Sequence, residues 1–404
     1  MRVLLFTGKG GVGKTTIAAA TAVHAARSGV KTLVASADAA HSLADCLGVP
    51  LGADPVEVEP GLAALHVDSR ARGERSWRAV QEYLIGVLDA LGVDPVSAEE
   101  LTVLPGAEEV LALLEVRDLV QRADHDLVVV DCAPSAETLR LLALPEALSR
   151  YLELALPVER RVLRAMAAGA RAVRGVDGVL PRPRDHVVEA AERLHAELAG
   201  VRDVLAGPGT SVRLVLTPEA LVIAEARRTL TALALYGYAV DGIVANRLVP
   251  GTGRDGWRSG WARAQAARLA EAEPSFAPAP VLRAGYARDE PIGVEALAAL
   301  ATTLYGVPGP DGAAALLAHP DVAARLRVQR DGDGFVLVLP LPDVDRNQLA
   351  LARVGDDLRL DVDGRRRSLS LPSVLRRCLV TGARLRGGEL RVAFRPDPDL
   401  WPVR

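Results

Sequence analysis

The residues best suited to chemistry lie together in the first sixteen positions of the chain. Gly8, Gly13, Lys14 and Thr15 fill the pattern G-x-x-x-x-G-K-T, in which backbone N–H groups turn inward around phosphates. In such a loop the lysine reaches the phosphates, the hydroxyl can bind Mg²⁺, and the N-terminus of the following helix adds the positive end of its dipole. The pattern predicts a nucleotide-phosphate site. A glycine-rich turn at a strand–helix junction is the plainer alternative.

A second lysine, Lys9, directly follows Gly8 in a chain that uses lysine rarely. The only lysines are Lys9, Lys14 and Lys31, and the other 45 of the 48 basic residues are arginine. An ammonium group is compact, whereas a guanidinium is planar, so lysine suits a crowded phosphate loop better. We therefore expect Lys9 to act at the phosphates as well.

Two aspartates stand at the ends of apolar segments that predict strands. Asp38 follows residues 31–36, and Asp131 closes residues 125–131. Ligands of open α/β sheets bind beyond the carboxyl ends of the strands. An acid after a hydrophobic strand can lie near the Mg²⁺ of a phosphate loop. We expect Asp131 to be associated with the metal; the alternative is a capping role at the end of its strand.

Alternating strands and helices carry these residues. The predicted strands of this part of the chain are residues 3–6, 31–36, 64–68, 125–131, 211–216 and 239–245. This alternation predicts an α/β fold with a doubly wound, mainly parallel sheet. Helical patterns at about 70–122 and 151–205 predict a helical subdomain. The apolar stripes within 151–205 indicate either core packing or a groove for an apolar client.

The composition changes near residue 307. We expect residues 1–306 to form the nucleotide-binding domain and residues 307–325 to form a linker. From 326 to 396, short strands with alternating faces and Gly/Asp turns predict a small all-β sandwich. Nothing in this segment resembles a catalytic constellation, so we expect a binding or stabilising module.

Composition, charge and the spacing of cysteines exclude several classes of protein. Half of the residues are hydrophobic and the net charge is −3 at pH 7, so no direct binding of nucleic acid is expected. The three cysteines, Cys46, Cys132 and Cys378, lack the paired spacing of a metal site. There is no signal-peptide pattern. No apolar stretch approaches the roughly 18 residues of a membrane span. We therefore expect a soluble, cytoplasmic protein.

With these pieces lined up, the chain resembles the ArsA family of ATPases, which includes arsenite-pump ATPases and targeting factors for tail-anchored membrane proteins. GKGGVGKTT at 8–16 matches the deviant Walker A loop of that family. DAAHS at 38–42 and DCAPSAETLRLL at 131–142 are similar to its first and second switches. Residues 326–396 resemble an α-crystallin-type, small-heat-shock-like domain, mainly through 339–351 and 388–394.

The resemblance implies ATP and Mg²⁺ as cofactors and a role for each matching residue. The phosphates would be bound by Gly8, Lys9, Gly10, Gly11, Val12, Gly13, Lys14, Thr15 and Thr16. Thr15 and Asp131 would hold the metal, and Asp38 would orient the attacking water. Lys9 would reach across a nucleotide-sandwich homodimer to the partner's phosphates, so Lys9, Lys14 and Asp38 are the expected catalytic residues. On the nucleoside side, Glu219, Asn246 and Arg247 match family segments, with Asn246 at the adenine.

The chain also departs from the family pattern. Ala39 replaces the proline of the first switch, and the second switch differs at Cys132, Ser135, Ala136 and Glu137. The thiol triad of arsenite ATPases and the zinc-binding CxxC of eukaryotic targeting factors have no counterpart. With only two methionines, the chain has no methionine-rich client groove.

From these features we expect a Mg²⁺-dependent ATP hydrolase that acts as a nucleotide-switched homodimer. It would bind or deliver a client such as a hydrophobic protein segment, with a membrane protein as a further candidate partner. One alternative is a chaperone-like holdase in which nucleotide mainly locks the dimer. The others are an arsenite-pump subunit and a partitioning ATPase that positions cargo on DNA or membrane.

Overall fold

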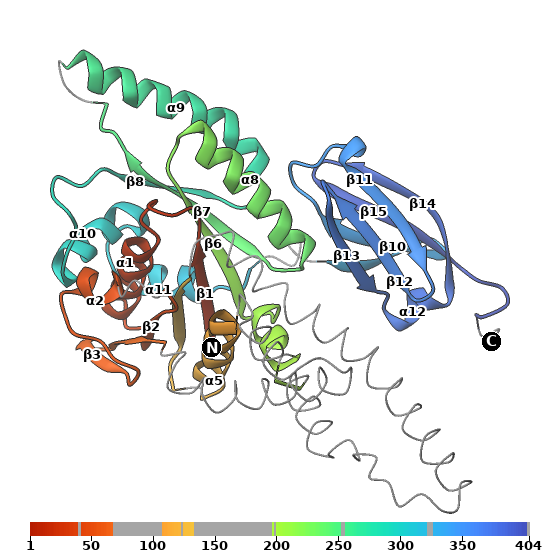
Figure 1. Cartoon of the computed structure of the whole chain (residues 1–404), viewed down its shortest axis with the longest axis horizontal. Coiled ribbons are helices and arrows are strands. Elements are labelled where there is room, and N and C mark those ends of the chain that lie inside the picture. The colour runs from red at the N-terminus through yellow and green to blue at the C-terminus, as the bar shows by residue number, and fades with distance from the viewer. Residues whose placement is uncertain are drawn as a thin grey trace, which may run out of the picture. The chain divides into compact units, whose positions relative to one another are not determined.

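The computed structural model describes residues 1–38, 42–67, 107–122, 124–132, 196–197, 199–251, 255–320 and 326–401 (Figure 1). The chain divides into two compact units. The first consists of residues 1–66, 124–139 and 208–404, and the second of residues 67–123 and 140–207.

An eight-stranded sheet in the order β3-β4-β2-β5-β1-β6-β7-β8 forms the centre of the first unit. Its strands are β1 (Arg2–Thr7), β2 (Thr32–Ser36), β3 (Val56–Glu59), β4 (Leu62–His66), β5 (Leu127–Asp131), β6 (Thr210–Leu216), β7 (Val240–Leu248) and β8 (Val281–Gly285). Neighbouring strands run parallel except β3 and β4. The predicted doubly wound, mainly parallel sheet is confirmed. Two of its outer strands, β3 and β8, were not predicted.

Helices cover both faces of this sheet. They are α1 (Lys14–Arg27), α2 (Ser42–Leu47), α8 (Ala220–Leu235), α9 (Gly256–Phe276), α10 (Val294–Tyr305) and α11 (Pro310–Leu317). The first two and the last two share one apolar cluster with the sheet, and α8 and α9 lie on the other face (Figure 1). Because both faces are covered, the central strands are continuously apolar, as in most parallel sheets. Helix α11 lies inside the segment 307–325 that the sequence predicts to be a linker.

Residues 326–401 form two antiparallel sheets, in the orders β14-β15-β10-β9 and β11-β12-β13. Their strands are β9 (Arg327–Asp331), β10 (Gly334–Pro340), β11 (Leu349–Val354), β12 (Asp357–Val362), β13 (Arg365–Ser370), β14 (Cys378–Arg386) and β15 (Glu389–Pro396), with a short helix α12 (Ser373–Arg376). On β12, buried Leu358, Leu360 and Val362 alternate with less buried residues and contribute to one apolar cluster. The all-β architecture predicted for this segment is confirmed.

The C-terminal turns of α8 contact this β-domain. Leu235 is buried in the β-domain's apolar cluster. The Thr231 hydroxyl donates a hydrogen bond of 2.6 Å to the carbonyl of Pro342, and Arg365 donates one of 3.0 Å to the carbonyl of Arg228. One helix of the nucleotide-binding domain therefore contributes directly to the β-domain's core.

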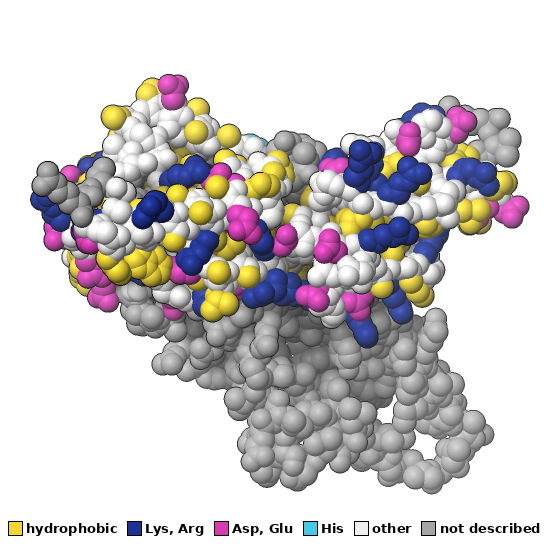
Figure 2. All heavy atoms as spheres, turned by 90° about the horizontal axis from the view of Figure 1, so that it is seen from above, with side chains coloured by type: hydrophobic (Ala, Val, Ile, Leu, Met, Phe, Trp, Pro, Cys, Tyr) yellow, Lys and Arg dark blue, Asp and Glu magenta, His cyan; other side chains and the backbone are white. Residues whose placement is uncertain are grey.

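The described part of the second unit consists mainly of α5 (Ala107–Gln121) and residues 199–207. Arg117 of α5 donates a hydrogen bond of 3.1 Å to the carbonyl of Glu197. Most of the helical subdomain predicted at 70–122 and 151–205 lies outside the described residues. None of the helices in the described part of the chain has the length and apolar character needed to cross a bilayer. Basic and acidic side chains are both spread over the described surface seen in Figure 2.

His24 is buried in α1 where it packs against α10 and α11. Its side chain is 1% exposed, and its ring lies 5.2 Å from that of Tyr305. Neither ring nitrogen has a hydrogen-bond partner among the described residues. A Cβ at Gly312 of α11 would stand 2.7 Å from Nε2, so the two helices pack tightly at this point. Burial lowers the pKa of His24 because it disfavours the charged imidazolium.

Lowering the pH should therefore destabilise the fold through His24. The unfolded chain takes up this proton near pH 6.5, whereas the folded chain does so only at lower pH. The stability that depends on neutral His24 is thus complete above about pH 6.5 and is lost as the pH falls toward the folded pKa. Measured by urea unfolding, the free energy of unfolding should fall as the pH is lowered from about 7.5 to 5.5. This fall should be smaller in His24→Leu than in the wild type. His319→Gln, at an exposed histidine, is the control, and equal slopes in all three proteins would contradict the assignment.

Candidate active site

The phosphate loop lies between β1 and α1, at the carboxyl edge of the sheet. Close backbone packing requires glycine at both ends of the loop. A Cβ at Gly8 would collide with the carbonyl oxygen of Val215 on the neighbouring strand β6. Gly13 is the N-cap residue of α1 with φ 90°, and a Cβ there would stand 2.5 Å from the amide nitrogen of Asn246. Strand β6 and the end of β7 therefore hold the loop in place.

Hydroxyl and carboxylate groups from α1, α2, β2 and β5 meet beside the loop. The Thr15 hydroxyl donates a hydrogen bond of 2.7 Å to Oδ2 of Asp131 and lies 3.1 Å from the Ser42 hydroxyl. Ser36 donates to the same Asp131 oxygen at 3.3 Å, and its hydroxyl accepts from the backbone N–H of Asp38 at 3.3 Å. Ser36 and Asp131 are register partners on adjacent strands, which explains their proximity. Thr15, Asp38 and Asp131, distant in the sequence, are thus close in space.

Asp131 is fully buried, and its environment favours a nearby cation. Burial raises the pKa of this carboxyl to about 6; the hydrogen bond from Thr15 and the charge of Lys14 lower it, while Asp38 raises it. Oδ1 of Asp131 has no hydrogen-bond partner among the described residues. A buried carboxylate oxygen is costly when it is left unpaired. A carboxylate beside a threonine hydroxyl supplies the oxygen ligands that Mg²⁺ prefers, so these residues fit a hydrated magnesium ion.

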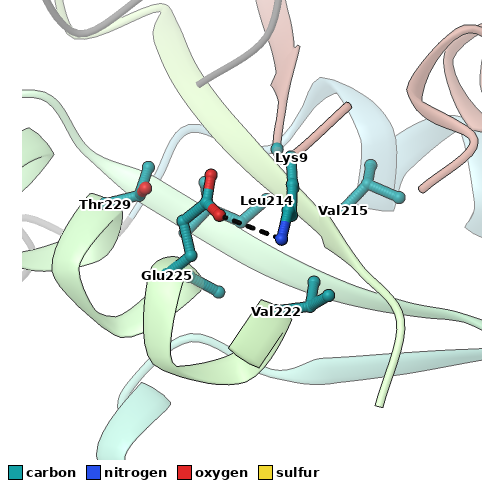
Figure 3. Close-up of a pocket in the computed structure, with 8 residues that line it drawn as sticks. Lys9, Leu214, Val215, Val222, Glu225 and Thr229 are labelled. Carbon is teal, nitrogen blue, oxygen red and sulfur yellow. Dashed lines mark ion pairs between the residues drawn. The ribbon is translucent and has the colours of Figure 1, made fainter. Parts of the chain in front are cut away.

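The two lysines of the loop have different partners. Lys14 is 7% exposed, and its positive charge lowers the pKa of the buried Asp131 carboxyl. Lys9 is more open: its side chain is 43% exposed, and Nζ lies 3.7 Å from Oε2 of Glu225 on α8 (Figure 3). Lys14 is therefore the buried lysine of the loop, and Lys9 is the exposed one, paired with α8.

The residues predicted on the nucleoside side lie between β6 and α8 and in the last part of β7. The Asn246 amide donates a hydrogen bond of 2.8 Å to the carbonyl of Val12, and its oxygen accepts one of 2.8 Å from the N–H of Arg247. In this structure Asn246 thus ties β7 to the phosphate loop. Glu219 precedes α8 as its N-cap residue, and its Oε2 is buried without a hydrogen-bond partner among the described residues. Gln265 of α9 accepts a hydrogen bond from the N–H of Val249 and so braces the start of the β7–α9 connection.

Sequence reasoning did not assign Ser36, Ser42 or Glu225 to the site. Ser36 ends a predicted strand two residues before Asp38, and Ser42 belongs to the DAAHS motif, so both carried a local signal. No sequence pattern indicated Glu225, because its proximity to Lys9 depends on how α8 packs. Residues 39–41 and 133–140, which include most of the altered switch positions, lie outside the described residues.

Comparison with known proteins decides the family. The model of the ArsA-type, anion-transporting ATPase family matches residues 1–306, and that of the HSP20-like domain found in ArsA matches residues 332–394. The chain belongs to the ArsA family of ATPases. The phosphate loop described above thus belongs to an ArsA-type ATPase domain, and the β-domain is an HSP20-like domain.

Relatives of similar length support this conclusion. The chain is 42% identical to an uncharacterised protein of Streptomyces coelicolor, over 100% of this chain and 99% of that protein. It is 34% identical to a Chlorobaculum tepidum protein with the provisional name arsenical pump-driving ATPase, over 92% and 90% of the two chains. An Aquifex aeolicus protein with a similar provisional name is 30% identical over 97% and 99%. The similarity therefore spans both domains.

The contact between Gly8 and Val215 gives a test of the loop's packing. Gly8→Ala should lower the free energy of unfolding by about 3 kcal/mol, because the new Cβ must displace β1 or β6. Urea unfolding followed by circular dichroism measures this. Gly10→Ala is the matched control, since a Cβ at Gly10 would meet no atom within 4 Å among the described residues. Equal losses of stability in the two variants would show that the close approach at Gly8 is not limiting.

Proposed function

We propose that this ArsA-family ATPase hydrolyses Mg²⁺-ATP as a nucleotide-switched homodimer, and that the switch controls binding of a client such as a hydrophobic protein segment. The observation that carries the proposal is the division of the two loop lysines. Lys14 acts on the buried Asp131, while the exposed Lys9 is directed to α8. In the proposal, Lys14 binds the phosphates of its own chain, and the more exposed Lys9 binds those of a second chain.

Within one protomer, Lys14 and the loop amides hold the phosphates, and Thr15 and Asp131 hold the metal. Bound Mg²⁺ would neutralise charge that develops on the phosphate oxygens. The backbone N–H of Asp38 bonds to Ser36 beside this cluster, and in the proposal the Asp38 carboxylate orients water for attack. Glu219 and Asn246, at the ends of β6 and β7, border the nucleoside side of the site. These roles follow the family pattern and agree with the proximity of the side chains.

Lys9 completes the site from across the dimer in this proposal. A cation that approaches the transferring phosphoryl group only when two protomers meet makes hydrolysis depend on assembly, as an arginine finger does. Release of phosphate would then loosen the dimer. Residues 151–205, for which the sequence predicts helices, are the proposed client region, because their apolar stripes suit a hydrophobic segment.

Loss of Lys9 or Asp38 should abolish most ATP turnover. Lys9→Ala removes the cation that offsets transition-state charge, and Asp38→Asn removes the group that orients water. Each should lower kcat by about a hundred-fold or more. Steady-state phosphate release measures the rates, and Lys31→Ala, at an exposed lysine outside the site, is the control for Lys9. Turnover by Lys9→Ala at the wild-type rate would rule out its role in trans.

The HSP20-like domain favours a second candidate, a holdase in which nucleotide mainly locks the dimer. Its match to the HSP20-like domain supports a role in binding unfolded segments. Suppression of thermal aggregation of a model substrate, with ATP and with the Asp38→Asn variant, separates the two functions. A client switch predicts that ATP turnover changes the amount of protected substrate. A holdase predicts equal protection by the wild type and by the variant.

Metalloid binding is the function suggested by the provisional names of two relatives. In this chain the three cysteines are buried. Burial raises the pKa of Cys46 to about 11 and that of Cys132 to about 12, and it also raises the pKa of Cys378. Thiolates, not thiols, are the ligands for such ions. We therefore do not propose arsenite as the ligand of this chain.

A further inference from the structure

Lys9 is paired within its own chain with a carboxylate from α8. Nζ of Lys9 lies 3.7 Å from Oε2 of Glu225, and the two side chains are 43% and 30% exposed. Figure 3 shows the lysine reaching toward Glu225, with Val222 close to its ammonium end. The ion pair is thus accessible to solvent but bordered by apolar side chains.

The residues around the pair pack tightly against the loop at Gly8, next to Lys9. The pair lies at a small pocket, which is also lined by Gly8, Leu214, Val215, Val222, Ala226 and Thr229. Val215 is the residue whose carbonyl oxygen touches Gly8, so the start of the loop is packed against β6. Lys9 follows directly, and its long, 43% exposed side chain can rotate toward a new partner.

We propose that Glu225 is a positioning residue for Lys9: an intrachain counter-ion that the phosphates of a second protomer must displace. The inference rests on the proposed function, in which Lys9 acts across a homodimer. Two anions, one from each chain, compete for one ammonium group. The pair in the single chain keeps Lys9 directed to α8 and away from the buried Asp131 cluster. Every productive encounter of two protomers breaks this pair, so Glu225 sets the concentration at which the dimer forms.

Glu225→Gln tests the proposal because it keeps the size of the side chain and removes its charge. The full-length variant should dimerise with Mg²⁺-ATP at a protein concentration about two- to five-fold lower than the wild type, which is the range for a partly exposed ion pair. Analytical ultracentrifugation of the Asp38→Asn background, where ATP persists, measures this midpoint. Salt should narrow the difference by screening the pair. Glu271→Gln, at an exposed glutamate of α9, is the control and should leave the midpoint unchanged.

A double-mutant comparison separates positioning from a merely structural role. In a Lys9→Ala background, Glu225→Gln should have no further effect on the dimerisation midpoint, because in this proposal Glu225 acts on the dimer through Lys9. An effect of equal size with and without Lys9 overturns the proposal, as does a midpoint equal to or higher than that of the wild type. If Glu225→Gln unfolds, Glu225→Asp, which shortens the carboxylate's reach, should give a shift in the same direction.

Failure of this inference is distinct from failure of the proposed function. If Lys9→Ala alone leaves both dimerisation and ATP turnover unchanged, the role of Lys9 in trans is wrong, and the inference fails with it. If Lys9→Ala weakens dimerisation while Glu225→Gln does not shift the midpoint, only the role of Glu225 is wrong.

Discussion

The site depends on the close packing of the phosphate loop against its neighbouring strands. At Gly8 the loop touches the carbonyl of Val215 on β6, and at Val12 it accepts the amide of Asn246 from the end of β7. These contacts exist only because β1 lies inside the sheet, with β5 on one side and β6 on the other. The loop is therefore built by three strands and not by its own residues alone. A change in the packing of β6 or β7 reaches the phosphate site directly.

The same strand order explains the chemistry at Asp131. β5 lies between β1 and β2, so the carboxyl end of β5 stands beside both the phosphate loop and Ser36. Parallel strands bring their ends to one edge of the sheet, where side chains from distant segments converge. Burial by the surrounding strands raises the carboxyl's pKa, and Thr15 and Lys14 oppose this effect. Asp131 is thus a buried carboxyl group whose charged form a nearby cation would stabilise.

The first turns of helix α8 contact the phosphate loop, and its last turns contact the HSP20-like domain. Near its start it carries Glu225, beside Lys9, and at its end Leu235 lies in the apolar cluster of the HSP20-like domain. The ATPase site and the β-domain therefore share one structural element.

The structural features that depend on local residue patterns could be predicted from the sequence. Apolar runs and the glycine loop indicated the central strands, α1 and the nucleotide motif, and alternation in residues 326–396 indicated the β-domain. Long-range packing was not predictable in the same way. The pairing of Ser36 with Asp131 depends on strand order, and that of Lys9 with Glu225 depends on the path of α8. The outer strands β3 and β8 were missed because they are short and only partly buried, so their apolar pattern is weak.

The scarcity of lysine has a consequence for how this protein responds to amine chemistry. Of the three lysines, Lys14 is buried, and Lys9 and Lys31 are exposed. Apart from the N-terminal amine, acylating reagents and enzymes that acetylate lysine thus meet only two open targets on each chain, and one of them lies in the phosphate loop. Acylation there would erase the charge of Lys9. Because nearly all other basic residues are arginine, Lys9 is one of the few side chains of this protein whose charge acylation can remove.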